Sequence, residues 1–233
     1  MKKLAVICFL TILCSCHKEK VSNDQSSSQN NQPPSGTNPS PTQKQSEALW
    51  PIVNSNYWVF RDSTFNSDGT LLAASLNDSI KATDSTNFNS KFYFGPDPAV
   101  EKTYYREADD STIEYYNDNI KASQIFFKEV STNNSVVTKI EGDLTLLLNG
   151  TNKTYDVLHV QTGYTDLTKI NEFDSCIRNE LIETYSGDTS YKCIIYMKPG
   201  VGMVKYLLYV MKDETPGKLY LYFKRELLTY HIQ

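Results

Sequence analysis

The sequence predicts an all-β protein built around a curved antiparallel sheet, arranged either as a sandwich or as a half-barrel. From residue 48 onward, apolar and polar residues alternate with a period of two in many short segments, which is the pattern of half-buried strands. Turn-forming pairs such as Asp68-Gly69 separate most of these segments. All 16 tyrosines lie between Tyr57 and Tyr230, and tyrosine suits a pleated, half-buried surface.

Each predicted strand rests on this alternation, or on an aromatic and β-branched run between two turns. In chain order the predicted strands cover residues 57–64, 91–94, 103–107, 112–117, 124–130, 136–148, 153–164, 191–198, 203–212 and 219–227. The first strand places Trp58 and Phe60 on one face, and we expect both rings to be buried in the sheet. The segment 136–148 is either one strand or a hairpin broken at Gly142-Asp143.

One segment has a different period. Ile170, Phe173, Ile177 and Leu181 recur at helical spacing, which predicts one short helix near residues 170–182. A strand over residues 177–185 is the alternative. The rest of the chain has few helical patterns, so the predicted class remains all-β with this single helix.

The first residues carry the features of an export signal. Two lysines precede an apolar stretch of about ten residues, which suits a signal peptide and is too short to span a membrane. The stretch ends in the letters LCSC, which resemble the bacterial lipobox and end at Cys16. The resemblance implies that residues 1–15 are a signal peptide and that Cys16 receives the lipid. An ordinary secretory signal with incidental cysteines is the alternative.

Residues 16–47 form a predicted disordered tether, which begins with the acylated cysteine. In the stretch 21–47, Ser, Asn, Gln, Pro, Thr and Gly account for 23 of 27 residues, so this stretch cannot bury enough apolar surface to order itself. Its four prolines could instead form a polyproline II motif for a partner protein. Residues 48–233 then form a single β-rich domain, because no second linker or internal repeat divides them.

Charge and motifs argue against several functions. The formal net charge is −4, which disfavours nucleic acid as the main partner. The sequence contains no G-x-S-x-G, H-E-x-x-H or phosphate-binding loop motif. Of its three histidines, His17 adjoins the predicted lipid on Cys16, whereas His159 and His231 stand apart from cysteine pairs and fit strand patterns as partly buried residues. We therefore expect no enzymatic activity, no cofactor and no metal centre.

Two tyrosine doublets are candidates for ligand binding. Tyr104-Tyr105 and Tyr115-Tyr116 must each put one ring on either face of a strand, so one ring of each doublet could stack on a ligand such as a sugar. The alternative is that these tyrosines simply fill a half-buried sheet surface.

Cys176 and Cys193 are the two cysteines that follow Cys16. An exported compartment permits a disulfide between them, which would stabilise the fold by roughly 3 kcal/mol through loop closure. Cys193 has the parity of its apolar neighbours, so two free, buried thiols are the alternative.

Short motifs across residues 48–233 are similar to those of a group of uncharacterised envelope lipoproteins from Bacteroidota-type Gram-negative bacteria. These motifs are WP at 50–51, NYWVF at 56–60, KTYDVLHV at 153–160, PGVGMVK at 199–205 and RELLTY at 225–230. Ser55 stands where that group usually has Gly. The resemblance implies a β-rich architecture and an envelope location, and it implies no activity.

These observations favour a non-enzymatic envelope lipoprotein that binds a glycan or a partner protein. A carrier that holds a lipid or another apolar ligand in a groove of the curved sheet is the first alternative, since the run 203–211 is unusually apolar. A hydrolase with an unfamiliar site is the second. We expect attachment to the outer membrane through the lipid on Cys16, because Lys18 and Glu19 replace the Asp that commonly retains lipoproteins in the inner membrane.

Overall fold

The computed structural model describes residues 48–53, 55–82, 84–97, 102–119, 121–148, 151–212 and 215–233. These residues belong to one unit of the chain, Ser46–Gln233. The predicted signal peptide, the lipid-attachment residue Cys16 and the tether lie outside the described residues. Within the described part, no helix is long and apolar enough to cross a membrane.

All the regular structure in the described residues is β-strand, which confirms the predicted fold class. In chain order the strands are β1 (Tyr57–Phe65), β2 (Leu71–Lys81), β3 (Asp84–Phe88), β4 (Lys91–Gly95), β5 (Thr103–Asp109), β6 (Thr112–Asn117), β7 (Ala122–Lys128), β8 (Ser135–Leu148), β9 (Thr151–Ile170), β10 (Phe173–Tyr185), β11 (Asp188–Lys198), β12 (Gly202–Lys212) and β13 (Thr215–His231). β8 runs through Gly142-Asp143 as one strand, so the expected break into a hairpin does not occur.

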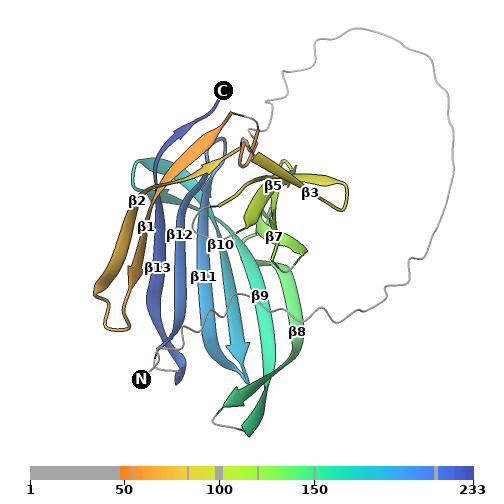
Figure 1. The fold of residues 1–233 in the computed structure, drawn as a ribbon, viewed down its shortest axis with the longest axis vertical. Helices are drawn as coiled ribbons and strands as arrows, with labels where there is room; N and C mark the ends of the chain where they lie inside the picture. Colours follow the sequence, from red (N-terminus) through yellow and green to blue (C-terminus); the bar gives the residue numbers. More distant parts are fainter. Residues whose placement is uncertain are drawn as a thin grey trace, which may run out of the picture. The chain divides into compact units, whose positions relative to one another are not determined.

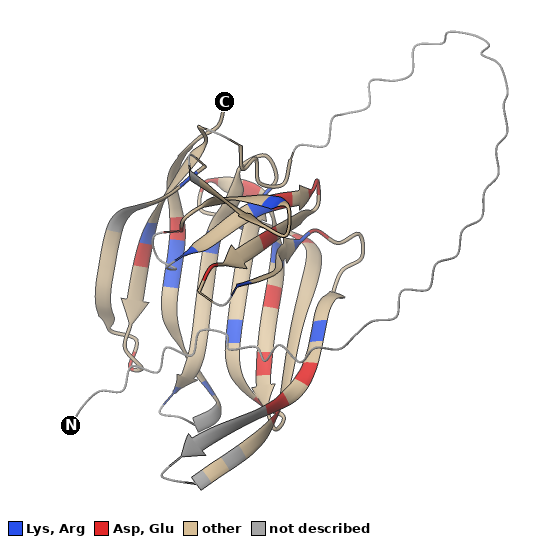
Figure 2. Ribbon diagram, turned by 45° about the vertical axis from the view of Figure 1, so that its right-hand side comes forward, with Lys and Arg blue, Asp and Glu red and all other residues tan. Residues whose placement is uncertain are grey.

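The strands form two antiparallel sheets. The larger sheet has the order β2-β1-β13-β12-β11-β10-β9-β8, so that β2 and β8 are its edges. The smaller sheet has the order β3-β4-β5-β6-β7. Figures 1 and 2 show the smaller sheet against one face of the larger sheet, toward the end near the C-terminus. We call this the inner face, and its other end is not covered by the smaller sheet.

The segment expected as a helix is a strand. β10 lies between β9 and β11, and Ile177 and Leu181 have the same parity as the buried Asn179, as a strand of period two requires. The pairing with β9 shifts register on both sides of Cys176. These irregularities give the apolar residues Ile170, Phe173 and Ile177 a spacing that imitates a helix.

β2 and β3 are not among the predicted strands. β2 begins with residues that are exposed on both of its faces, so it shows no alternation of buried and exposed positions there. β3 reads DSTNF, and four of these five residues are typical of turns. Each strand is stabilised by its hairpin partner, β1 for β2 and β4 for β3.

The core between the sheets is built around two tryptophans. Trp50 and Trp58 are fully buried, and so is Phe60, which confirms the prediction for Trp58 and Phe60. The Trp50 ring meets Trp58 edge-on with centroids 5.5 Å apart, and Trp58 Nε1 donates to the Val201 carbonyl at 2.6 Å. Trp50 also packs on Tyr105 of the smaller sheet at 5.2 Å. The first described residues therefore fill the space between the two sheets.

A buried charge cluster joins the sheets. Arg225 of β13 donates to both Asp62 oxygens, at 2.8 and 2.7 Å, and to Asp97 Oδ2 at 2.6 Å. Asp62 lies on β1, whereas Asp97 follows β4 and also accepts a hydrogen bond from the Tyr105 hydroxyl at 2.9 Å. Burial alone would lower the pKa of Arg225, but the two carboxylates outweigh burial and raise it, so the guanidinium stays charged.

A second polar contact fixes β7 on the larger sheet. Asn179 Oδ1 accepts a hydrogen bond from the Lys128 N–H at 3.0 Å, and Asn179 Nδ2 donates to the Lys128 carbonyl at 2.9 Å. The side-chain amide therefore binds the backbone of β7 as a neighbouring strand would. Gln161 Nε2 donates to the Phe126 carbonyl and to Asn179 Oδ1, both at 3.0 Å.

Candidate functional site

The uncovered part of the inner face carries a row of side chains that strand register brings together. Asn179, which holds β7, has the same parity as Glu183, four residues further along β10. Four residues of strand span about 13 Å, so Glu183 lies beyond this contact with the smaller sheet. Strand pairing places one residue from each of six neighbouring strands side by side at the level of Glu183. From β13 to β8 these residues are Tyr220, Val210, Tyr191, Glu183, His159 and Ile140. We call these six residues the inner-face row.

The inner-face row mixes aromatic, apolar and polar side chains and is partly open to solvent. Four of its members are half-buried, Ile140 is 36% exposed, and His159 is buried. Tyr155 and Tyr185 lie further along the same face, with ring centroids 5.9 Å apart. Aromatic rings therefore surround a polar centre.

His159 and Glu183 form this polar centre. They are cross-strand partners, and His159 Nδ1 lies 3.5 Å from Glu183 Oε2. The histidine side chain is 7% exposed, and its Nδ1 makes no hydrogen bond with the described protein. A buried polar atom without a partner is unfavourable. Glu183 is 18% exposed, so its carboxylate can accept a hydrogen bond from a ligand hydroxyl, whereas His159 Nδ1 is fully buried behind it.

Tyr191 links the row to a cluster of neutral polar groups. Tyr206 hydrogen-bonds with both Tyr191 and Cys193. Burial raises the pKa of Cys193 to about 12, and it raises the pKa of both tyrosines above the ordinary value. At neutral pH the thiol therefore stays protonated, and it is not the thiolate that nucleophilic catalysis requires.

The four tyrosines predicted as candidates for ligand stacking do not share one surface, because they lie on two faces of the smaller sheet. The doublets alternate between the two faces of the smaller sheet and pair as Tyr104 with Tyr116 and Tyr105 with Tyr115. Tyr105 and Tyr116 are only 4% and 2% exposed, because neighbouring aromatic rings pack against them. Tyr104 and Tyr115 are half-buried. The alternation of side chains along a strand correctly predicts that each doublet puts one ring on each face of the smaller sheet. On the face turned away from the larger sheet, rings of β3 and β4 cover Tyr116.

The candidate disulfide is absent, and Cys176 and Cys193 are both free and buried. Cys193 pairs with Leu181 in the register of β10 and β11, and Leu181 is five residues along β10 from Cys176. Five residues of strand correspond to about 16 Å, whereas the Cα atoms of a disulfide lie within about 7 Å. The register therefore holds the two thiols apart.

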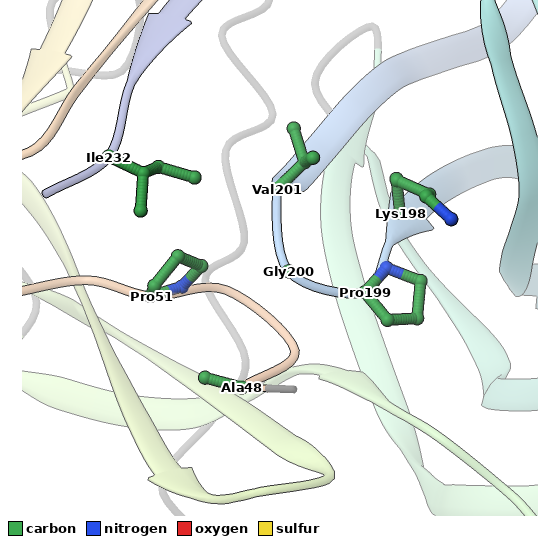
Figure 3. Close-up of a pocket in the computed structure, with 7 residues that line it drawn as sticks. All are labelled: Ala48, Pro51, Lys198, Pro199, Gly200, Val201 and Ile232. Atoms are coloured by element: carbon green, nitrogen blue, oxygen red, sulfur yellow. The ribbon is translucent and has the colours of Figure 1, made fainter. Parts of the chain in front are cut away.

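Two hollows lie elsewhere on the surface. Figure 3 shows the first, of about 540 Å³, whose lining is Ala48, Pro51, Lys198, Pro199, Gly200, Val201 and Ile232. The Lys198 amine points away from Ile232 in this view. The second hollow, of about 490 Å³, includes Glu141, Asp143 and Asp156 in its lining. In the part of the chain that the structure describes, no group of three His, Cys, Asp or Glu side chains is placed to hold a metal ion.

The inner-face row is not among the sites that the sequence predicts. His159 is correctly expected on a strand, but Glu183 lies just after the segment expected as a helix. Register alone brings them together with Tyr191, which comes from a third strand. The signal that the sequence does contain is a histidine within a strand pattern. His231, the other histidine expected on a strand, is exposed and stacks on Tyr57 with centroids 5.5 Å apart.

Comparisons with known proteins found little that resembles this chain. No protein-family model matches it. No curated protein matches it either. A solved structure from Bacteroides fragilis, of a protein with a YmcC-like fold that is thought to be exported, is similar at a TM-score of 0.44 and 12% sequence identity. The match covers 80% of this chain and 100% of that chain.

Proposed function

We propose that this chain is a lipid-anchored envelope module that binds a glycan along the inner-face row without catalysing a reaction. One observation carries the proposal: Glu183 lies beside a buried, unpartnered His159 nitrogen in a row that also contains tyrosines. Sugar rings have C–H faces that pack on aromatic rings and hydroxyl groups that bind carboxylate and imidazole. The inner-face row offers both kinds of contact side by side.

The polar centre favours a glycan over a purely apolar ligand. A fatty acyl chain along the row would cover the Glu183 carboxylate without giving it a hydrogen-bond partner. Leaving a polar group buried and unpaired costs roughly 1–3 kcal/mol, and a charged group costs more. A hydroxyl-rich ligand avoids this cost because it supplies donors and acceptors at the same place.

The chemistry of the row also favours binding over turnover. Glycoside hydrolysis commonly uses two carboxyl groups about 5–10 Å apart. Glu183 is the one carboxyl group among the six residues of the row. The neighbouring Cys193 has a pKa of about 12 and offers no thiolate at neutral pH.

Glycan binding can be tested with the mature, tethered protein on an array of bacterial oligosaccharides, followed by calorimetric titration of each binder. We expect Glu183→Gln to weaken binding about tenfold or more, since a hydrogen bond to a charged group contributes roughly 1.5–3 kcal/mol. Glu180→Gln is the matched control, because Glu180 has the opposite parity on β10 and pairs with Lys192 at 2.8 Å. Equal loss in both variants, or saturable fatty acid binding that ignores Glu183, would contradict the glycan assignment.

The anchor is an independent part of the proposal. The lipobox-like letters that end at Cys16 support lipid attachment there, and Lys18 and Glu19 favour the outer membrane. We expect Cys16→Ala to abolish metabolic labelling with palmitate and to leave an uncleaved precursor. Cys14→Ala should retain the label. Persistent labelling of the Cys16→Ala chain would exclude Cys16 as the attachment site.

A further inference from the structure

Glu183 differs from three other half-buried glutamates in the charge beside it. In each of those three, a lysine or arginine nitrogen lies 2.8 Å from a carboxylate oxygen. These ion pairs are Arg106 with Glu114, Lys192 with Glu180 and Lys224 with Glu226. Their glutamate side chains are 12% to 18% exposed, and Glu183 is 18% exposed. In the described part of the chain, however, no lysine or arginine forms an ion pair with Glu183, which lies beside His159 instead.

The neighbours of Glu183 on the inner face include no lysine or arginine. Leu181 and Tyr185 flank it along β10, two residues away on either side. His159 and Tyr191 are its cross-strand partners on β9 and β11. An imidazole carries a charge only when it is protonated, whereas lysine and arginine are charged throughout the neutral range. The Glu183 carboxylate is therefore partly removed from water without a lysine or arginine to offset its charge.

A ligand that covers Glu183 would remove the water that still reaches its carboxylate. The free-energy cost of this removal is much larger for an ionised carboxylate than for a neutral polar group, unless a cation pairs with it. A ligand hydroxyl donates one neutral hydrogen bond. A protonated amine donates up to three hydrogen bonds and also brings the opposite charge. The chemical group that Glu183 fits best is therefore a ligand ammonium group.

The tyrosines beside Glu183 suit the same group. The face of an aromatic ring attracts a cation, and it also packs on the C–H groups of a sugar. Tyr191 lies directly opposite Glu183, and the Cβ atoms of such partners are roughly 4.5–5.5 Å apart. Tyr185 is two residues along the same face, and Tyr155 extends this aromatic surface with ring centroids 5.9 Å apart. A sugar ring on these tyrosines can place an amino substituent at the carboxylate.

We propose that the glycan bound by the inner-face row carries a free, protonated amino group that forms an ion pair with Glu183. This inference rests on the proposed glycan binding and narrows its ligand to amino sugars without an N-acetyl group. Acetylation converts the amine into a neutral amide, which cannot offset the charge of the carboxylate. The formal net charge of −4 also favours the approach of a cationic ligand.

A matched pair of oligosaccharides tests this inference. Short oligomers of glucosamine and of N-acetylglucosamine, of equal length and linkage, differ only in the acetyl groups. Calorimetric titration of the mature, tethered protein at about pH 6 keeps amines mostly protonated and carboxyl groups in general mostly ionised. We expect the free-amine oligomer to bind about tenfold or more tightly than the acetylated one, since a hydrogen bond between charged groups is roughly twice as strong as a neutral one.

Three variants assign the preference to one carboxylate. Glu183→Gln should abolish the preference for the free amine, because it removes the charge and keeps the shape of the side chain. Glu183→Asp keeps the charge on a shorter side chain, so it should still prefer the free amine. Glu180→Gln is the matched control and should keep the full preference, since Glu180 has the opposite parity on β10 and already pairs with Lys192. Thermal unfolding midpoints equal to that of the wild type will show that the variants are folded.

Failure of this inference differs from failure of glycan binding itself. Equal affinity for the two oligomers, or binding of uncharged oligosaccharides alone, overturns the amino-group assignment and leaves glycan binding intact. A preference for the free amine that persists in Glu183→Gln overturns the role of Glu183, and it indicates a general attraction of cations to an acidic protein. The absence of binding to any oligosaccharide on the array overturns both proposals.

Discussion

At the scale of single residues, Gly202 shows why Trp50 can fill the space between the sheets. Gly202 has a φ of +104°, a conformation that residues with a Cβ rarely adopt. A Cβ at this position would also overlap the Trp50 ring. Glycine is therefore required at this position for two reasons: the backbone conformation, and the close packing of a fully buried tryptophan.

We expect Gly202→Ala to lower the free energy of unfolding by about 3 kcal/mol or more, from backbone strain and overpacking together. Gly187→Ala is the matched control, because Gly187 has a φ of +91° with nothing within 4 Å of the added Cβ. It should cost about 1–2 kcal/mol. Denaturant unfolding of Gly202→Ala, Trp50→Ala and the double variant gives the coupling free energy between residues 50 and 202. Fully additive losses would show that the Trp50 ring is not what excludes a side chain at 202.

Glu107 gives the stability a pH dependence of known sign. Burial raises the pKa of Glu107, and the carboxylates of Asp110 and Asp109 add to the shift, although backbone N–H groups of Trp50 and Leu49 oppose it. A raised folded-state pKa means that the folded protein binds the proton more tightly than the unfolded chain does. The contribution of Glu107 to stability is therefore lost as the pH rises above about 4.5, the ordinary value for Glu.

We expect Glu107→Gln to be more stable than the wild type at pH 7 and equal to it at pH values below the ordinary Glu range. Thermal unfolding measured across this range checks the prediction. Glu114→Gln is the opposing control: burial raises the pKa of Glu114, but hydrogen bonds from Arg106, Tyr93 and Lys91 outweigh burial and lower it. That variant should be less stable at pH 7. A Glu107→Gln variant that loses stability at pH 7 would contradict the assignment.

At the scale of elements, Asn179 replaces a missing strand pairing for β7. We expect Asn179→Ala to cost about 2–3 kcal/mol, because the backbone groups of Lys128 and the Gln161 amide lose their buried partner. Hydrogen exchange should show the largest loss of protection at the Lys128 amide. Asn133→Ala is the control, since Asn133 is exposed and hydrogen-bonds with Asp166. Unchanged exchange at Lys128 would show that β7 is held by packing alone.

At the scale of the whole molecule, Arg225 ties the two sheets together. Arg225→Met should cost about 3–5 kcal/mol, because it leaves Asp62 and Asp97 buried without their cation. Arg106→Met breaks a half-buried pair with Glu114 inside the smaller sheet, and it should cost about 1 kcal/mol or less. Chemical denaturation measures both losses. Equal losses of unfolding free energy would show that the Arg225 cluster stabilises the fold no more than the ion pair of Arg106 within one sheet does.

Particular residues show how far sequence reasoning reaches in this molecule. β6 is expected and observed over the same residues, Thr112–Asn117, because its apolar and aromatic residues lie between two clear turns. β10 is mistaken for a helix because two register shifts disturb its period near Cys176. The candidate site cannot be predicted from the sequence, for a more general reason. His159, Glu183 and Tyr191 come from three strands, and no local pattern states which residues of different strands lie opposite each other.

By itself, the sequence determined the all-β class, most of the turns and the burial of Trp58 and Phe60, because alternation and turn chemistry are local properties. Tertiary structure alone decided that one ring of each tyrosine doublet is buried against aromatic neighbours, that the two thiols lie apart, and that Glu183 lies beside His159. These outcomes depend on which strands are neighbours and in which register they pair. Register is set by contacts between residues far apart in the chain, so it becomes fixed only when the two sheets fold together.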